Sequence, residues 1–366
     1  MARWKWAAFP ACLFLFSRLG IFLIVGWSLK VEPLTHRPSD PLAFPVLDGL
    51  CRWDCGWYAQ ISAHGYQFLA QANFFPLFPL LGRALSAVTH LPPVTTLPLC
   101  ANLLGFAALL TVYRVFEQSE GEEVAQLACL LWVAWPFSFF QSAGYAESAM
   151  VLATASALYL SSKGRHLAAG TALGLGILAR HLCAIALPAL LYAQIRKRGS
   201  RPAKLLGDQA IWGLVVACAL GSLYPRYLHH HFGDALAFIH ARTQTWSDPA
   251  WAAHSVVEYF RPGNPRYPEI GLGVFLSVIP GLGAGGLLLR KKWWAMASFA
   301  IPLMVLAWMV GLAGLGRYTG SAWPAFLPLG LWLAHKWPKL KYPTVYLFAV
   351  VQGVLVYLYS HSYPIN

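Results

Sequence analysis

Continuous apolar runs, separated by short polar segments, dominate the pattern along the chain. Many of them approach the ~20 residues that an α-helix needs to cross a bilayer, beginning with residues 7–29. The runs are continuous rather than alternating, which argues against the strands of a β-barrel. Because helices satisfy their own backbone polar groups in lipid, the pattern predicts an all-α polytopic membrane protein with about eleven transmembrane helices.

Two long polar-aromatic loops interrupt these runs, and the pattern places both on the same side of the membrane. We expect a first outer loop at residues 30–73, an interfacial helix at 74–90 and a second outer loop at 229–269. Two of the spans end at Arg290 and Lys336, and the chain forms one integral-membrane domain over residues 1–366. The remaining spans after the first are expected at residues 95–116, 124–143, 147–160, 167–178, 182–195, 209–228, 293–315 and 343–359.

The positions of the basic residues predict which end of each span faces the cytoplasm. The formal net charge is +13, but the lysines and arginines cluster in short loops such as RKRGSRPAK (196–204) and KWPKLK (336–341). This is the distribution of cytoplasmic anchors rather than of a nucleic-acid-binding face. Arg3 and Lys5 then place the N-terminus in the cytoplasm, and every lysine except Lys30 falls on that side. The C-terminus and both long loops are expected outside.

Charged residues are scarce, at 11% of the chain, so each one near a span needs a partner or a task. Glu147 begins a predicted span, where it would also complement the helix dipole. Arg180 lies between two short spans, and Arg317 precedes Tyr318 at the start of another. Arginine makes forked hydrogen bonds that suit phosphate, although both arginines could equally reach lipid head groups.

The first outer loop contains the stretch CRWDCGWYAQISAHGYQ (51–67), in which Asp54 stands beside two tryptophans. Trp53 and Trp57 are four residues apart, so we expect them on one helical face, with Asp54 and Tyr58 on the neighbouring stripe. An aromatic belt explains the tryptophans but not the aspartate. Cys51 and Cys55 could pair if this loop faces an oxidising space; unpaired cysteines are the favoured interpretation. His229, His230 and His231 end a span, and an interfacial role is favoured over metal binding.

Five segments occur in an order that resembles the PIG-V-like mannosyltransferases of the GT-C glycosyltransferase superfamily. They are RWDCGWYAQISAHGY, FFPLFPLLGR, PFSFFQSAGYAES, LARHLCAIALPAL and GRYTGSAWPAFLPL, joined by AFIHARTQTW at residues 237–246. The resemblance implies a GT-C fold and the transfer of a sugar, mannose in this family, from a polyprenyl-phosphate carrier to a hydroxyl on the non-cytoplasmic face. The eukaryotic family acts on the glycosylphosphatidylinositol precursor, but this chain is nearer in length to the bacterial relatives. We therefore expect a bacterial inner membrane.

The resemblance also implies roles for individual residues. GT-C proteins carry an essential aspartate in the first outer loop, which corresponds to Asp54 as general base, with Asp48 as the second candidate. Cations must meet the charge that grows on the leaving phosphate, and Arg180, Arg317 and Arg52 are the candidates. The expected substrate-binding residues are Trp53, Trp57, Tyr58, Asp48, Tyr145, Glu147 and Tyr318, with His64 and Gln244 as weaker candidates.

The expected partners are a lipid-linked sugar donor and a lipid or glycan acceptor, without nucleic acid. No cofactor and no metal site are expected, although the sequence leaves a divalent metal open. Two rival interpretations stay open at this point. One is a transporter or lipid flippase, which would place its charges or broken helices near the bilayer midplane. The other is a structural membrane subunit with a degenerate site.

Overall fold

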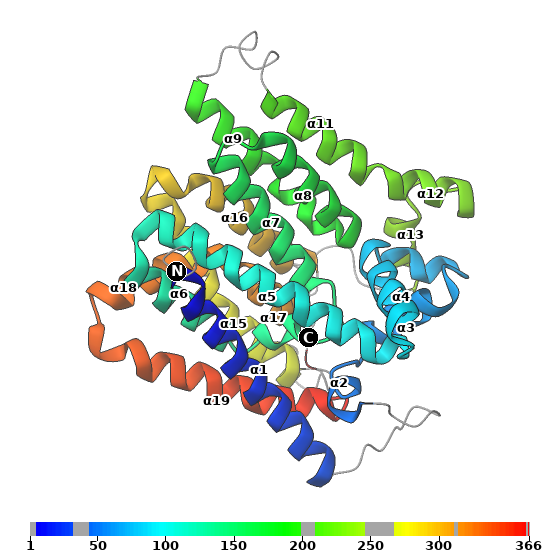
Figure 1. Ribbon diagram of the computed structural model, residues 1–366, viewed down its shortest axis with the longest axis horizontal. Helices are drawn as coiled ribbons and strands as arrows, with labels where there is room; N and C mark the ends of the chain where they lie inside the picture. The colour runs from blue at the N-terminus through cyan, green and yellow to red at the C-terminus, as the bar shows by residue number, and fades with distance from the viewer. Residues whose placement is uncertain are drawn as a thin grey trace.

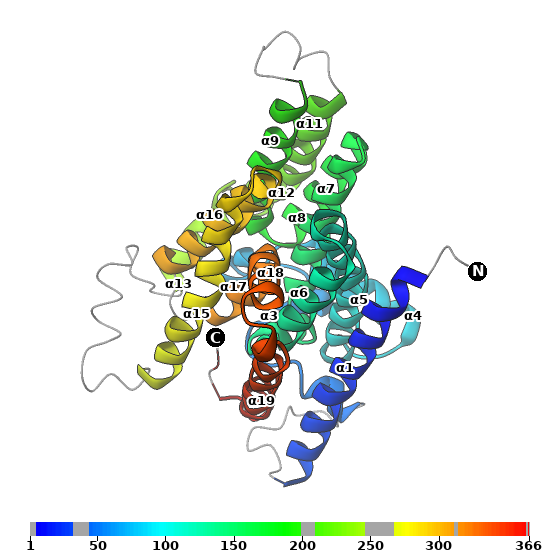
Figure 2. The ribbon, with the colours of Figure 1, turned by 90° about the vertical axis from the view of Figure 1, so that its left-hand side faces the viewer.

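Helices form all of the regular secondary structure in the described part of the chain, residues 5–31, 44–198, 209–245, 267–310, 314–363 and 365 of the computed structural model. The expectation of an all-α protein is confirmed for these residues. In Figures 1 and 2 the longer helices cross the molecule in roughly one direction, with the N-terminal α1 packed against the C-terminal α19.

Six helical stretches of the described residues are long and apolar enough to cross a membrane. They are α1 (Lys5–Val31), α5 (Pro93–Glu120), α11 with α12 (Gln209–Gly221 and Leu223–Phe232), α15 with η5 (Tyr267–Gly286 and Leu287–Leu289), η6 with α16 (Lys291–Trp293 and Trp294–Val310) and η9 with α19 (Pro338–Leu340 and Lys341–Ser360). The predicted count of about eleven is not confirmed, because the other predicted spans are shorter helices. These are α6 (Glu122–Ala134), α7 (Glu147–Ser162), α8 (His166–Ala179), α9 (Leu187–Arg198) and α18 (Phe326–His335).

The structure breaks two of the predicted spans, one of them just before a proline. The span expected at residues 124–143 is wrong in its second half, because α6 ends at Ala134. The residue before a proline avoids the helical region, and Trp135, before Pro136, has φ −52° and ψ 132°. The chain continues through the short 3₁₀ helix η3 (Ser138–Gln141) to α7. The stretch around Pro324 is also divided, into α17 (Leu315–Ser321), η8 (Trp323–Ala325) and α18, and its break lies at Ala322, which has φ −78° and ψ 44°.

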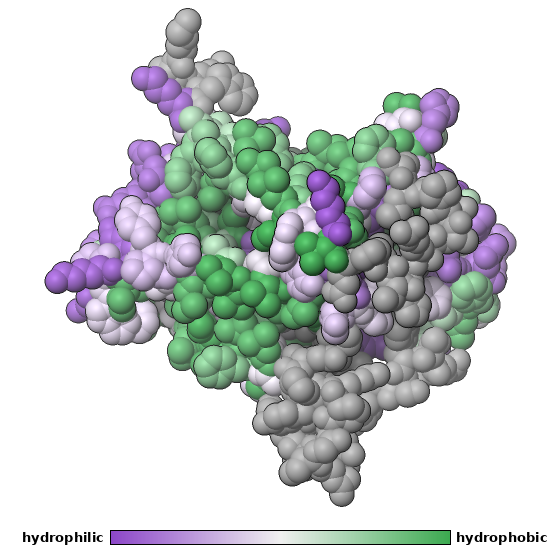
Figure 3. All heavy atoms as spheres, turned by 90° about the horizontal axis from the view of Figure 1, so that it is seen from below, coloured by the Kyte–Doolittle hydropathy of each residue, from purple (hydrophilic) through white to green (hydrophobic). Residues whose placement is uncertain are grey.

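Short helices gather at one end of the bundle, on the right in Figure 1. They are α2 (Pro45–Asp48), α3 (Asp54–His64), η2 (Leu69–Asn73), α4 (Leu77–Thr89), α12 and α13 (Ala237–Thr245). The helix expected at residues 74–90 corresponds to α4. At the opposite end lie α18 and the start of α19, where Lys341 Nζ donates to Glu123 Oε1 at 2.9 Å. Figure 3 shows a hydrophobic band between these two hydrophilic ends.

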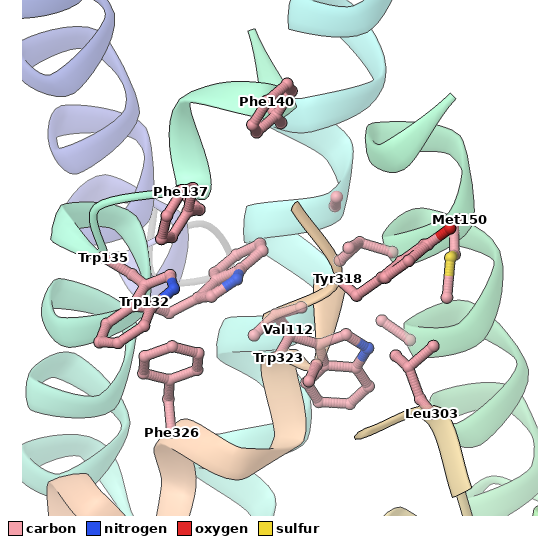
Figure 4. Close-up of a cluster of buried hydrophobic side chains, with 14 of the residues drawn as sticks. Val112, Trp132, Trp135, Phe137, Phe140, Met150, Leu303, Tyr318, Trp323 and Phe326 are labelled. Atoms are coloured by element: carbon pink, nitrogen blue, oxygen red, sulfur yellow. The ribbon is translucent and has the colours of Figure 1, made fainter. Parts of the chain in front are cut away.

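Buried tryptophans fix α17 in the centre of the bundle (Figure 4). The indole N–H of Trp132 donates to Gly320 O at 2.8 Å, and that of Trp135 donates to Thr319 Oγ1 at 2.7 Å. A buried indole that lacked an acceptor would lose about 1–3 kcal/mol, so these bonds specify one position for the helix. Arg317 belongs to α17 and comes just before Thr319 and Gly320, so the bonds that fix this helix also fix the backbone of Arg317.

Glycines bring α8 and α11 into close contact. A Cβ at Gly170 would lie 1.9 Å from Gly213 O, so no larger residue fits at this crossing. Small residues are the usual means by which helices pack in lipid, where apolar burial alone gives little driving force. The contact fixes the position of α8, which ends at Ala179. The next residue, Arg180, precedes the 3₁₀ helix η4 (His181–Ala186).

Candidate active site

Four charged side chains from four separate segments of the chain meet at the end of the bundle where the short helices gather. We call Asp54, Glu147, Arg180 and Arg317 the charged cluster. Arg317 Nη1 donates to Asp54 Oδ2, and Arg180 Nη1 donates to Glu147 Oε1 at 2.5 Å. Arg317 Nε lies 3.5 Å from the same glutamate oxygen. Two carboxylates and two guanidiniums therefore form one connected, formally neutral group.

Both carboxylates of the charged cluster stand at helix N-termini. Asp54 is the first residue of α3 and Glu147 the first of α7, where the helix dipole favours negative charge. The Glu147 side chain is fully buried, whereas that of Asp54 is 28% exposed. Asp54 Oδ1 makes no hydrogen bond with the described residues, because its ion pair uses Oδ2 alone. One aspartate oxygen thus stays available to accept a proton.

Tyr145 connects the two chain segments that carry these carboxylates. Its hydroxyl donates to Arg52 O at 3.1 Å and accepts the backbone N–H of Asp54 at 3.2 Å. The backbone N–H of Gly144 donates to Leu50 O at 3.1 Å. A Cβ at Gly144 would lie 2.3 Å from the Cys55 sulfur, so glycine is needed for this approach. The segment before α7 therefore sets the position of Asp54.

The backbone at Trp53 is in a conformation that bulky residues rarely adopt. Its φ is +51°, and it precedes the helix instead of belonging to it. The expectation that Trp53 and Trp57 share a helical face is therefore wrong, because α3 begins only at Asp54. Trp57 stacks on Phe74, with ring centroids 5.7 Å apart. Strained backbone persists where surrounding contacts enforce it and is common beside functional groups, which suits the residue next to Asp54.

A disulfide joins Cys51 and Cys55, whose Cα atoms are 5.1 Å apart. The favoured interpretation of two unpaired cysteines is therefore wrong. The sequence spacing did not show that the tight turn before α3 brings the two Cβ atoms within bonding range. The bond closes a small ring around Arg52, Trp53 and Asp54, and its Cys55 sulfur packs against Gly144, just before α7.

Asp48 and Arg52 have structural partners outside the charged cluster. Asp48 is buried, and its carboxylate accepts Thr95 Oγ1–H at 2.6 Å and the backbone N–H of Phe44 at 3.2 Å. Arg52 Nε donates to Ser360 O at 3.1 Å, and its Nη1 bonds backbone carbonyls of its own loop. These contacts attach the loop to α5 and to the C-terminal helix. They favour supporting roles, and substrate contact by either residue stays a prediction.

Tyrosines surround the charged cluster. The guanidinium of Arg180 lies 5.3 Å from the ring centre of Tyr318, and that of Arg317 lies 5.6 Å from it and 5.5 Å from the ring centre of Tyr145. Tyr58 lies one turn beyond Asp54 and is buried. Burial raises the pKa of the Tyr58 and Tyr145 phenols, so both hydroxyls stay protonated and neutral beside the charges.

An apolar cavity of about 380 Å³ adjoins the charged cluster through Tyr318. Arg242 of α13, His181 of η4 and Asn73 are its other polar lining residues, and the remainder are leucine, isoleucine, alanine and phenylalanine. Sequence reasoning missed Arg242. The segment AFIHARTQTW contains the signal, but the sequence prediction names Gln244 there, and the Gln244 side chain lies outside the described residues. His64 is exposed at the far end of α3 and has no described contact with the cluster.

Metal ligands do not gather in the described part of the chain, where no group of three or more His, Cys, Asp or Glu side chains could hold an ion. His231 instead lies within hydrogen-bond distance of Tyr66 O, with its Nε2 at 3.0 Å. The charged cluster contains a carboxylate that can exchange a proton and two arginines that can bind an anion, and an apolar cavity adjoins it. It therefore has the components for transferring a group from an amphiphile with a charged head.

Comparison with known proteins confirms the resemblance over the N-terminal half. The family model described as mannosyltransferase (PIG-V) matches residues 39–197, a range that contains Asp54, Glu147 and Arg180. The GPI alpha-1,6-mannosyltransferase 2 of Mus musculus is 31% identical over 170 residues. That match covers 43% of this chain and 34% of the relative, so the chain matches about a third of the length of this curated protein.

Solved structures share the fold over the whole chain. ArnT from Cupriavidus metallidurans in the apo state superposes with a TM-score of 0.57 at 12% identity, covering 97% of this chain and 76% of ArnT. ArnT bound to undecaprenyl phosphate gives a TM-score of 0.56 at 11% identity, covering 100% of this chain and 77% of ArnT. The expected GT-C-type architecture is thereby confirmed, and at this level of identity the likeness concerns the fold alone.

Proposed function

We propose that this chain is a membrane mannosyltransferase that moves a sugar from a polyprenyl-phosphate donor to a hydroxyl group of a lipid or glycan acceptor. The observation that carries the proposal is the pairing of Asp54 with Arg317 beside the Arg180–Glu147 pair, next to an apolar cavity. Three of these four residues lie in the range matched by the mannosyltransferase model. The activity rests on this match together with the chemistry of the site.

Asp54 acts as the general base in this proposal. The acceptor oxygen attacks the anomeric carbon, and its proton passes to a carboxylate oxygen of Asp54. Asp54 Oδ1 suits this task because it has no hydrogen-bond partner among the described residues and the side chain is partly exposed. One base is enough for transfer with inversion, since the leaving group is a phosphate and needs no general acid.

The arginines receive the charge that the reaction releases. As the bond between the anomeric carbon and the phosphate oxygen breaks, its electron pair stays on that oxygen. Arg317 and Arg180 are held ready by Asp54 and Glu147, so they need no reorganisation to meet the growing negative charge. When the donor phosphate binds, Arg317 would pair with both the phosphate and Asp54. Its hold on Asp54 would then weaken, so that Asp54 could accept the proton.

The 380 Å³ cavity is the proposed position for the first isoprene units of the donor. Its lining is apolar except near Arg242, His181, Asn73 and Tyr318, so it can accommodate a chain while a cation lies near its phosphate end. The crystal structure of ArnT with undecaprenyl phosphate supports a donor of this kind, because it has the same overall fold.

The active site is proposed to face the non-cytoplasmic side of a bacterial inner membrane, with the N-terminus inside and the C-terminus outside. Two observations support the orientation. The disulfide beside Asp54 belongs to an oxidising compartment. Lys292, Lys336 and Lys341 lie at the other end of the bundle, as cytoplasmic anchors do.

A transporter or lipid flippase is the less favoured function. In the described residues the charged cluster lies at the end where α2, α3, α4 and α13 gather, rather than between two repeated halves of the bundle. Transporters instead bind their substrate near the midplane between such halves. Charge placement therefore favours chemistry at a membrane surface.

Sugar transfer in isolated membranes tests the proposal. Membranes that contain the wild-type chain receive labelled polyprenyl-phosphate mannose, and the label is followed into lipid and glycan fractions. We expect transfer by the wild type and a loss of at least ~100-fold in Asp54→Asn, the scale of general-base catalysis. The matched control is Asp234→Asn, the same change at an aspartate that pairs with His240 outside the cluster.

The control should transfer label at the wild-type rate. Equal rates for folded Asp54→Asn and wild type would show that Asp54 is not the base. Failure of the wild type with every lipid-linked sugar tried would overturn the enzyme proposal itself.

A further inference from the structure

A second elongated hollow lies at the end of the bundle opposite the charged cluster. We call it the basal groove; its volume is about 630 Å³, and it lies against α18, which packs on both α6 and α15 (Figure 2). Most of its lining is apolar: Val124, Leu282, Gly283, Gly286, Leu289, Pro328, Leu329 and Leu331. A Cβ at Gly283 of α15 would lie 2.2 Å from Ala325 O of η8, and one at Gly286 would lie 3.0 Å from Pro328 Cβ of α18, so α15 touches both elements beside the groove.

Cations outnumber acids at one end of the basal groove. Arg290 Nη1 donates to Glu120 Oε2 at 2.6 Å, and Lys292 Nζ lies 2.6 Å from the other glutamate oxygen. The Glu120 side chain is only 7% exposed, so its charge is already offset by two cations. Lys336 also lines the groove and has no ion pair among the described residues. The rim therefore carries excess positive charge.

Aromatic groups mark the same end as a membrane boundary. Trp293 and Trp332 line the groove, and the Arg290 guanidinium lies 5.0 Å from the Trp293 ring centre. The buried Trp293 Nε1–H has no hydrogen-bond acceptor among the described residues. Leu282 and Leu289, on the apolar side, are 67% and 84% exposed, which is the surface that a helix presents to lipid chains. Tryptophans and cations at the end of such a surface are typical of the head-group level.

We propose that the basal groove binds one anionic phospholipid, with an acyl chain along the leucines and the phosphate beside Arg290 and Lys336. The volume lies within the range of small-molecule sites, and the charges are complementary to an anionic head group. The site is separate from the charged cluster and takes no part in sugar transfer. The lipid would hold α15 against α18, and α15 also packs against α17.

Lipid retention tests this site. The full chain is purified in mild detergent, mixed with equal amounts of phosphatidylglycerol and phosphatidylcholine, and examined by native mass spectrometry. We expect the wild type to retain phosphatidylglycerol preferentially. Lys336→Gln should weaken this binding about fivefold, the factor for one basic side chain at an anionic surface, and adding Arg290→Gln should weaken it further.

Lys339→Gln is the matched control, because it makes the same change three residues away, outside the groove lining. It should retain the wild-type preference. Equal retention of both lipids by the wild type, or equal losses in Lys336→Gln and Lys339→Gln, would overturn the proposal and indicate general attraction to acidic membranes. Inorganic phosphate should not compete, since the site takes its affinity from the acyl chain as well as from the head group; full competition would show an anion site without lipid.

Discussion

Replacing Glu147 with glutamine tests whether the buried ion pair holds the charged cluster together. Glu147 is fully buried, the Arg180 side chain is 10% exposed, and their charged atoms are 2.5 Å apart. Removing one partner of such a pair leaves the other charge buried and uncompensated, which costs about 3–5 kcal/mol. Glu147→Gln should therefore lower the free energy of unfolding by this amount, since Arg180 has no other described carboxylate partner.

The double variant isolates the interaction free energy between Glu147 and Arg180 from the contacts that each residue makes with its other neighbours. In Glu147→Gln/Arg180→Gln both charges are gone, and Arg317 keeps Asp54 as its partner. We expect the double variant to be more stable than the sum of the single effects predicts, with a coupling free energy of about 1–3 kcal/mol. Titration of each purified protein with denaturing detergent, followed by tryptophan fluorescence, measures the unfolding curves of the wild type, Glu147→Gln, Arg180→Gln and the double variant.

Glu123→Gln provides the control for this cycle. Glu123 also pairs with a cation, Lys341, but its side chain is 76% exposed, and exposed pairs contribute little. Its unfolding midpoint should equal that of the wild type. The reasoning is refuted if Glu147→Gln unfolds at the wild-type midpoint, or if the two single effects add without coupling in the double variant.

Two further changes address the position of α17 and the role of Asp48. A Cβ at Gly316 would lie 2.3 Å from the Phe137 ring, so Gly316→Ala should displace Arg317 and reduce sugar transfer at least ~10-fold, as misplacement of a positioned group does. Gly56→Ala, whose Cβ meets nothing within 4 Å, should transfer at the wild-type rate; equal rates for both would contradict the argument. Thr95→Val removes a hydrogen bond to the Asp48 carboxylate and should cost about 1.5–3 kcal/mol of stability without loss of transfer by the folded protein. Thr111→Val, which removes only a bond within α5, is its control in unfolding titrations, and a transfer defect of the folded Thr95→Val would instead place Asp48 in the reaction.

Local patterns in the sequence predict the structural features that depend on residues close together in the chain, such as helices and their ends. The apolar runs predict the helical class, and the aspartate between tryptophans identifies the loop that contains Asp54. Glu147 stands where a helix begins, as the apolar run after it indicates, whereas the start of α3 at Asp54 was not predicted. The span expected at residues 124–143 is too long because its helix ends before Pro136, where composition alone would extend it.

Contacts between distant segments are not encoded in any local pattern. Arg317 and Asp54 are 263 residues apart, and their pairing depends on the tryptophans that fix α17 and on Tyr145. The positive φ of Trp53 likewise follows from its surroundings, because its residue type disfavours that conformation. Arg242 was overlooked since its importance comes from a cavity that only the assembled helices enclose.

Because Cys51 and Cys55 close a ring around Asp54, the redox conditions of sample preparation affect the activity that is measured afterwards. Thiol reductants in a lysis buffer, or a cell-free synthesis under reducing conditions, would open the ring while leaving the membrane helices intact. Two batches with the same sequence and the same elution profile would then differ at the turn that carries Asp54. Counting free thiols in each batch, before any turnover is measured, is therefore as informative as measuring its purity.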